Sequence, residues 1–248
     1  MDGSVSVSRK LWTKDDLIAA LRLYCITSFG RIHARNPDII ELADVLGRTP
    51  SAVALKMVNF ASLDPTLEQK GMSNSSKLDR EVWDEFFNDP QNLQPHGGDA
   101  ADGFSDVTAP AFEYASRMGL DVPFLSTRRI NQGFFRQLVL AAYDEKCAAT
   151  GLSSSELLVA GHIVPWSKEP AQRTNPRNGI CLNYLFDRAF DRGLISVRAD
   201  LALQYSSQLP ASTISLMRKV ALERVSLPSR FLPEPAFFEY HRDIVFRP

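Results

Sequence analysis

The chain of 248 residues has few cysteines and no long apolar run. Its three cysteines, Cys25, Cys147 and Cys181, stand far apart, without the paired spacing of a disulfide framework or of a cysteine-rich zinc site. The apolar runs fall far short of the ~20 residues that a membrane helix needs. The first thirty residues hold several aspartates and no apolar block, so we expect no signal peptide. These absences favour a cytoplasmic protein with no membrane partner.

The composition is that of a folded protein with an uneven distribution of charge. A hydrophobic fraction of 44% is enough for a buried core, and the length suggests one or two domains. The net charge is −1, yet residues 126–248 carry 16 basic and 11 acidic side chains, while residues 91–125 carry 1 and 5. Most of the basic residues in 126–248 are arginines, which bind phosphate well. This distribution favours a polyanionic partner for the C-terminal half.

The N-terminal part, residues 1–90, is predicted to be a small helical domain. Apolar residues at helical spacing predict a helix over 12–24, with Thr13 as its cap. A proline in the first helical position predicts two further helices, over 37–46 and 50–60. The short turn between them resembles that of the DNA-binding or Myb-like helix-turn-helix family.

Two uses of this domain fit the same pattern. If it binds DNA, Lys56 and Asn59 on the third helix are expected to face outward, where a reader of bases needs them, and Arg48 in the turn is expected to contact the duplex. A three-helix bundle that only packs or binds a partner protein has the same spacing. An acidic cluster over 79–85 is expected to keep DNA away from the end of this domain.

Residues 91–125 are rich in proline, glycine and aspartate and are interpreted as a linker that tolerates a cut. The C-terminal domain, 126–248, is expected to open with a helix over 126–143. One face of that helix carries Arg129, Gln132 and Arg136, which either contact DNA phosphates or are merely solvated.

Strand and helix signals follow in a suggestive order. Residues 157–161 read as a buried strand that ends at His162, and 180–182 read as a second strand. Asn183 is predicted to cap a helix that runs to Arg192 and stops at Gly193. A hairpin is expected over 194–205. Together with the N-terminal helices, these elements predict an α+β fold.

Four polar residues in this region have a spacing that suggests chemistry. Asp187 and Asp191 are one helical turn apart, so both carboxylates lie on one face. Carboxylate oxygens suit Mg²⁺ or Mn²⁺ better than Zn²⁺. His162 is positioned to accept a proton from water, and Asn178 to hold the following loop or the imidazole tautomer. Alternatively, the two aspartates only pair with Arg188 and Arg192 on a solvated helix.

The combined pattern resembles the HNH, or ββα-metal, endonucleases. The resemblance rests on Gly161-His162-Ile163-Val164-Pro165-Trp166, Asn178-Gly179-Ile180-Cys181-Leu182 and Phe186-Asp187-Arg188-Ala189-Phe190-Asp191-Arg192-Gly193-Leu194. The segments 129–136 and 147–151 are similar to the lead-in of the restriction-endonuclease-like branch of that family.

The resemblance implies roles for these residues. His162 is the general base, Asn178 the middle asparagine, and Asp187 and Asp191 the ligands of Mg²⁺ or Mn²⁺. The chain departs from the family at Gly161, where members often have a metal ligand, and at Asp187, where a third histidine is common. The implied activity is hydrolysis of double-stranded DNA, in a restriction-like or phage-defence setting. Further phosphate contacts are expected from Lys168, Arg173, Arg177, Arg188 and Arg192.

Other interpretations remain open at this point. One HNH site cuts one strand, so a homodimer is expected at least on DNA. The alternatives are a DNA-binding regulator, or an interaction protein, whose HNH domain does not catalyse. His241 is expected to serve packing or capping.

Overall fold

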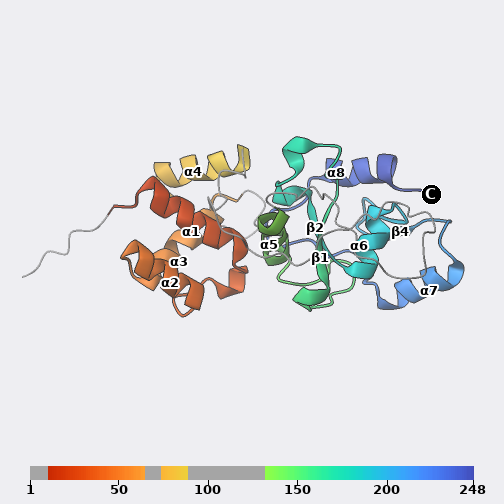
Figure 1. Ribbon diagram of the computed structural model, residues 1–248, viewed down its shortest axis with the longest axis horizontal. Helices are drawn as coiled ribbons and strands as arrows, with labels where there is room; N and C mark the ends of the chain where they lie inside the picture. Colours follow the sequence, from red (N-terminus) through yellow and green to blue (C-terminus); the bar gives the residue numbers. More distant parts are fainter. Residues whose placement is uncertain (1–10, 65–73, 89–131) are drawn as a thin grey trace, which may run out of the picture.

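The computed structural model describes residues 11–64, 74–88 and 132–248. It has the mixed α+β architecture that the sequence predicts, with helices at the N-terminal end and two small hairpins in the C-terminal part (Figure 1). Within the described ranges, no helix is both long and apolar enough to cross a membrane. The expected linker and Arg129 lie outside the described residues.

The three predicted N-terminal helices are present and begin where their capping residues stand. Helix α1 spans Lys14–Ile26, α2 spans Pro37–Leu46 and α3 spans Pro50–Ala61. The hydroxyl of Thr13 accepts a hydrogen bond from the Asp16 amide and completes a capping box. Gly47 ends α2 with φ +61°, a left-handed conformation that costs glycine little.

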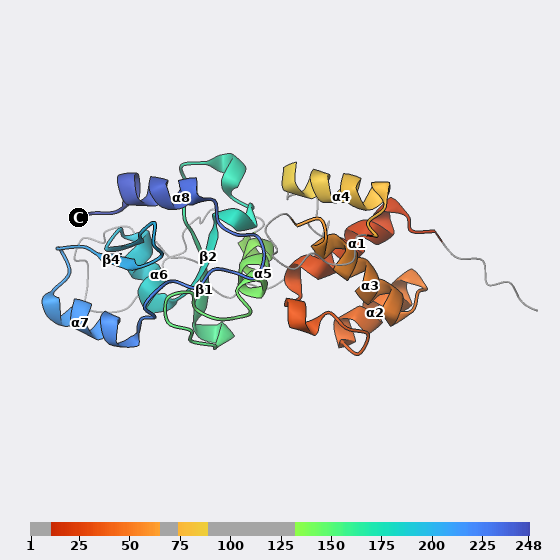
Figure 2. The same ribbon diagram turned by 180° about the vertical axis from the view of Figure 1, so that it is seen from behind.

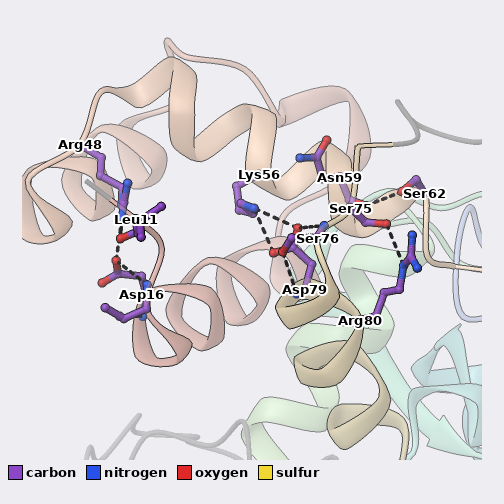
Figure 3. A network of polar contacts seen from close by, with 11 residues as sticks. Leu11, Asp16, Arg48, Lys56, Asn59, Ser62, Ser75, Ser76, Asp79 and Arg80 are labelled. Atoms are coloured by element: carbon purple, nitrogen blue, oxygen red, sulfur yellow. Dashed lines mark hydrogen bonds and ion pairs between the residues drawn. The ribbon is translucent and has the colours of Figure 1, made fainter. Parts of the chain in front are cut away.

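Helix α4, Lys77–Asn88, was not predicted, and it changes the interpretation of the acidic cluster. Asp79 on this helix is fully buried, and both of its oxygens lie 3.0 Å from Nζ of Lys56 (Figure 3). It also accepts a hydrogen bond from the Ser76 amide at 2.8 Å. Asp79 therefore belongs to the core of the helical domain and not to an acidic surface.

The expected outward orientation of Lys56 and Asn59 is wrong, and Arg48 is engaged within the N-terminal helical part. Lys56 is 8% exposed and Asn59 is 7% exposed, because α4 covers this side of α3 (Figure 3). The Arg48 guanidinium donates to the Asp16 carboxylate at 2.8 Å and to the Leu11 carbonyl at 2.7 Å. It also stacks on the Trp12 ring, 3.9 Å from its centroid. Arg48 and Lys56 are therefore engaged in contacts within the N-terminal helical part, and Asn59 is buried there.

The C-terminal part has the strand, strand and helix that the sequence predicts. Strands β1, Leu158–His162, and β2, Gly179–Asn183, pair antiparallel, with His162 opposite Gly179. Helix α6, Tyr184–Asp191, follows at once because Asn183 caps it through the Phe186 amide at 3.1 Å. Strands β3, Ile195–Val197, and β4, Leu203–Tyr205, form the expected second hairpin.

Further helices complete the described structure. Helix α5 spans Gln132–Ala142 and packs against β1 and β2. Helix α7 spans Ala211–Val220, and α8, Pro235–Tyr240, continues into a π-helical turn at His241–Val245. Short 3-10 helices span Phe29–Arg31, Ser155–Leu157, Pro170–Gln172 and Pro176–Asn178.

The two parts of the chain pack against each other through a buried arginine. Arg230 is 1% exposed, and its guanidinium donates to the main-chain carbonyls of Tyr24 and Thr27, where α1 ends. The rings of Phe86 and Phe231 lie 6.1 Å apart in the same region, and α5 contacts α1. In both ribbon views the end of α1 accordingly lies beside α5 (Figures 1 and 2).

Candidate active site

His162 stands at the end of β1 with its ring held on two sides. The Phe135 ring of α5 stacks on the imidazole, with centroids 4.1 Å apart and planes 10° apart. The Trp166 ring meets the imidazole edge-on at 5.5 Å. Trp166 is part of the sequence motif, but neither its contact with the imidazole nor that of Phe135 was predicted. The ring contacts fix the imidazole plane while the side chain stays half-buried.

A hydrogen bond selects the tautomer of His162. Its Nε2 atom lies 2.8 Å from the carbonyl oxygen of Arg173. Because a carbonyl only accepts, Nε2 must carry the proton of this bond. In the neutral ring, Nδ1 is therefore the basic nitrogen.

Asn178 ties down the loop that connects β1 to β2. It is 1% exposed, and its Oδ1 accepts from the Val164 amide at 2.8 Å. Its Nδ2 donates to the carbonyls of Val164 at 3.0 Å and Gln172 at 3.2 Å. These hydrogen bonds hold the loop in place, which is one of the two roles predicted for Asn178. Arg173, whose carbonyl accepts from His162, directly follows Gln172, so the clamp also positions that carbonyl.

Asp187 reaches from α6 to the backbone beside His162. A Cβ atom placed on Gly161 would lie 2.6 Å from Oδ1 of Asp187, closer than real side chains come. The carboxylate thus occupies the space that a side chain at position 161 would need. The two departures from the HNH pattern are therefore coupled: the acid at position 187 lies over the glycine that replaces a common ligand.

Asp191 follows Asp187 by one turn of α6 and is more exposed. Its side chain is 64% exposed and lies 3.8 Å from the Arg188 guanidinium, a distance at which an exposed ion pair contributes little. Among the described residues, no group of three or more His, Cys, Asp or Glu side chains could hold a metal ion. A metal held by these two carboxylates alone would fill the rest of its coordination shell from water or substrate.

A second histidine holds the far end of α6. His241 is 1% exposed, its ring stacks on Phe190 at 3.7 Å, and its Nε2 lies 3.1 Å from the Phe190 carbonyl. Its Nδ1 lies 2.9 Å from the Ser196 hydroxyl. Burial lowers the pKa of His241 to about 4, so the ring is neutral near pH 7. The expected packing role of His241 is confirmed.

The cysteines in this region are packing residues, as expected. Cys147 and Cys181 are both buried and free of disulfides. Burial raises the pKa of Cys181 to about 12, which disfavours the thiolate that metal binding needs. The Sγ of Cys147 accepts a hydrogen bond from the Asn183 amide at 3.2 Å and supports the start of α6.

The arginines expected to contact DNA fall into two groups. The Arg136 guanidinium donates to the carbonyls of Leu158 and Ser155, so its expected position on a solvated face is wrong. The side chains of Arg173 and Arg177 are half-buried and bind the carbonyls of Trp166 and Leu232. Those that are exposed around the site are Lys168, Arg188 and Arg192. The side chain of Gln132 lies outside the described residues.

Comparison with known protein families supports the interpretation of this region. Residues 147–198 match the model of a family described as HNH endonuclease. This segment forms an HNH endonuclease domain. The HNH domain contains β1, β2, α6 and β3, and with them His162, Asn178, Asp187 and Asp191. The match covers about a fifth of the chain, and no curated protein matches the sequence.

Proposed function

We propose that the protein is a metal-dependent endonuclease that hydrolyses phosphodiester bonds in double-stranded DNA. The observation that carries the proposal is the state of His162 within the HNH domain. Its Nε2–H donates a hydrogen bond to the Arg173 carbonyl, so Nδ1 is the basic nitrogen of the neutral ring. The Asp187 carboxylate lies over the neighbouring Gly161. A base at His162 and an acidic side chain that reaches the residue before it from α6 suit hydrolysis of a phosphodiester.

His162 acts as the general base in this mechanism. Nδ1 takes a proton from a water molecule, whose oxygen forms a bond to the phosphorus while the bond to the 3′ oxygen breaks. The products are a 5′-phosphate and, after the leaving oxygen takes a proton from solvent, a 3′-hydroxyl. A well-placed base contributes about 10²- to 10⁴-fold. The stacked Phe135 and the loop clamped by Asn178 hold the ring in place for this step.

Asp187 and Asp191 are the residues that would hold Mg²⁺ or Mn²⁺. Their hard oxygen donors fit these ions, and a site with few protein ligands fits an ion that keeps several waters. When bound, the ion supplies positive charge that stabilises the phosphate and the leaving oxygen. His241 and Asn183 fix the two ends of α6, so the helix backbone that carries both aspartates is held in place.

Phosphate contacts are assigned to the exposed cations around the site. Arg188 and Arg192 lie on the helix that carries both aspartates, and Lys168 lies in the loop after His162. Such contacts position the duplex without reading its sequence. A restriction-like or phage-defence role is supported by the similarity of the lead-in segments 129–136 and 147–151 to that branch of the HNH proteins.

Incubation of the purified protein with plasmid and phage DNA in Mg²⁺ or Mn²⁺ tests the proposal. We expect cleavage that His162→Ala abolishes, while DNA retardation on a gel remains. His33→Ala is the matched control, because His33 is exposed and far from α6 in the chain, and it should cleave like the parent. Retardation without cleavage by the parent protein, in either metal, would instead favour the DNA-binding regulator.

A further inference from the structure

The outer side of α2 and α3 has no exposed cation for DNA. Helix α2 contains no lysine or arginine, and the cation of α3, Lys56, is buried against Asp79. In the turn between the two helices, Arg48 has a side chain 7% exposed and pairs with Asp16. Binding to DNA depends on cations that replace counterions at the phosphates. These two helices are therefore poorly suited to the role of a DNA-reading helix-turn-helix.

The same surface instead combines acidic and apolar side chains. Asp38, Glu41 and Asp44 of α2 are all exposed. Val45 is 77% exposed and stands one turn after Glu41, and Leu55 of α3 is 49% exposed. We call the exposed side chains of α2 and α3 the head face. Large apolar side chains beside like charges are typical of a surface that binds a partner of opposite charge.

Helix α7 carries the complementary combination. Leu216 is 59% exposed and Val220, one turn later, is 51% exposed, while the buried side chain of this helix is Met217. Lys219 is exposed next to Leu216 on this side of the helix, whereas Arg218 lies on the other side, with its guanidinium 5.3 Å from the Tyr205 ring centroid. We call the surface formed by Leu216, Lys219 and Val220 the tail face.

The two faces lie at opposite ends of the molecule. Helices α2 and α3 form one end of the elongated chain, and α7 lies near the other (Figures 1 and 2). The tail face of a chain consequently lies far from its own head face. Their charges and apolar residues match across two molecules: the acids of α2 meet Lys219, and Val45 and Leu55 meet Leu216 and Val220.

We propose that the tail face of one copy docks on the head face of a second copy. This contact is heterologous, because the two surfaces differ, so it joins chains head to tail. It would bring two HNH sites into one assembly, which cutting both strands of a duplex requires. The proposal does not depend on the nuclease activity, since its test measures only the size of the assembly.

Sedimentation velocity of the full chain over a range of concentrations gives the first test. We expect the parent protein to form dimers and larger species. The average mass should fall when the apolar contact is removed by Val45→Ser with Leu55→Ser, or by Leu216→Ser with Val220→Ser. Each pair should raise the concentration for half-association by about ten-fold or more. All four residues are exposed, so these variants should fold as the parent does, which circular dichroism checks.

Mixing the two variants distinguishes this contact from a symmetric one. The first variant keeps an intact tail face and the second an intact head face, so an equimolar mixture should form dimers and nothing larger. If two identical faces paired instead, mixing the two variants would not produce this new dimer. Dimers of the mixture therefore support the head-to-tail contact, and two non-interacting monomers overturn it.

Charge exchange tests the pairing of the faces directly. Glu41→Lys and Lys219→Glu should each weaken association, and the two changes in one chain should restore it at least in part. Asp84→Lys and Lys146→Glu, exposed residues on other elements, are the controls and should have no effect. A parent chain that stays monomeric at all concentrations overturns the proposal. A head face that instead retards DNA, with retardation lost in Val45→Ser with Leu55→Ser, overturns it as well.

Discussion

The Oδ1 atom of Asp187 lies 2.6 Å from the point where a Cβ atom on Gly161 would stand. This relationship joins α6 to the residue before His162. It means that position 161 contributes space, and not a ligand, to the HNH domain. The acid that fills this space comes from the helix.

We predict that Gly161→Ala lowers cleavage by ten-fold or more. The new methyl group must push the Asp187 carboxylate aside, because 2.6 Å is far inside van der Waals contact. The free energy of unfolding should change by only about 1 kcal/mol, since a half-buried side chain can move. Cleavage rates and urea unfolding are the measurements. Gly30→Ala is the control, because nothing lies within 4 Å of its Cβ position, and equal activity of the two variants would contradict this account.

Removal of either carboxylate charge should change the metal requirement. We expect Asp187→Asn and Asp191→Asn to need higher Mg²⁺ or Mn²⁺ for half-maximal cleavage, with the larger effect for Asp187, the residue next to the base. Cleavage by the parent should stop in excess chelator. Metal titrations of initial rates measure this, with Asp200→Asn as an off-site control that pairs with Arg198. An unshifted titration in both variants would remove α6 from metal binding.

His241 should make the protein less stable in mild acid. Its pKa is about 4 in the folded chain against an ordinary 6.5, so the unfolded state binds more protons between these values. The free energy of unfolding should therefore fall as the pH drops from 6.5 to 4, by up to about 3 kcal/mol from this residue. In His241→Gln that part of the pH dependence should disappear. Urea unfolding from pH 7 to pH 4 measures the difference, and parallel curves would refute the assignment.

Loss of the buried guanidinium of Arg230 should destabilise the whole chain. Arg230→Met leaves the carbonyls of Tyr24 and Thr27 without their donor, at a cost of about 3 kcal/mol. The exposed Arg224→Met should cost little, and both are compared by urea unfolding. The same contacts predict that a fragment without residues 1–90 exposes Phe231 and aggregates, although the composition of the linker favours a tolerated cut.

Much of the fold was predictable because its signals are local. Thr13, Asn36, Gly47 and Asn183 mark helix ends by hydrogen bonds that span only a few residues. Helix α7 has no side-chain cap and buries little, so it gave no comparable signal. The fate of Lys56 was missed because its partner Asp79 stands 23 residues away on α4. The cap at Ser76 and the helical spacing of Leu78, Val82 and Phe86 are local signals that could have indicated this helix.

The candidate site likewise combines features that local sequence signals predict with features that depend on packing. The order of His162, Asn178, Asp187 and Asp191 was sufficient to predict a strand, a loop and a helix that bring these residues into one small domain. The stacking of Phe135 and the position of Asp187 over Gly161 depend on how those elements pack. Helical periodicity placed Arg136 on an outer face, but the neighbouring strand supplies carbonyls that bind it.

The contact between Arg230 and the end of α1 also sets an order of events during synthesis. The residues that it joins are 206 and 203 positions apart. At about 5–20 residues per second, the end of α1 is synthesised roughly 10–40 s before Arg230. Until then the last carbonyls of α1 must be solvated by water, so the two halves of the chain close on each other only after Arg230 has been made.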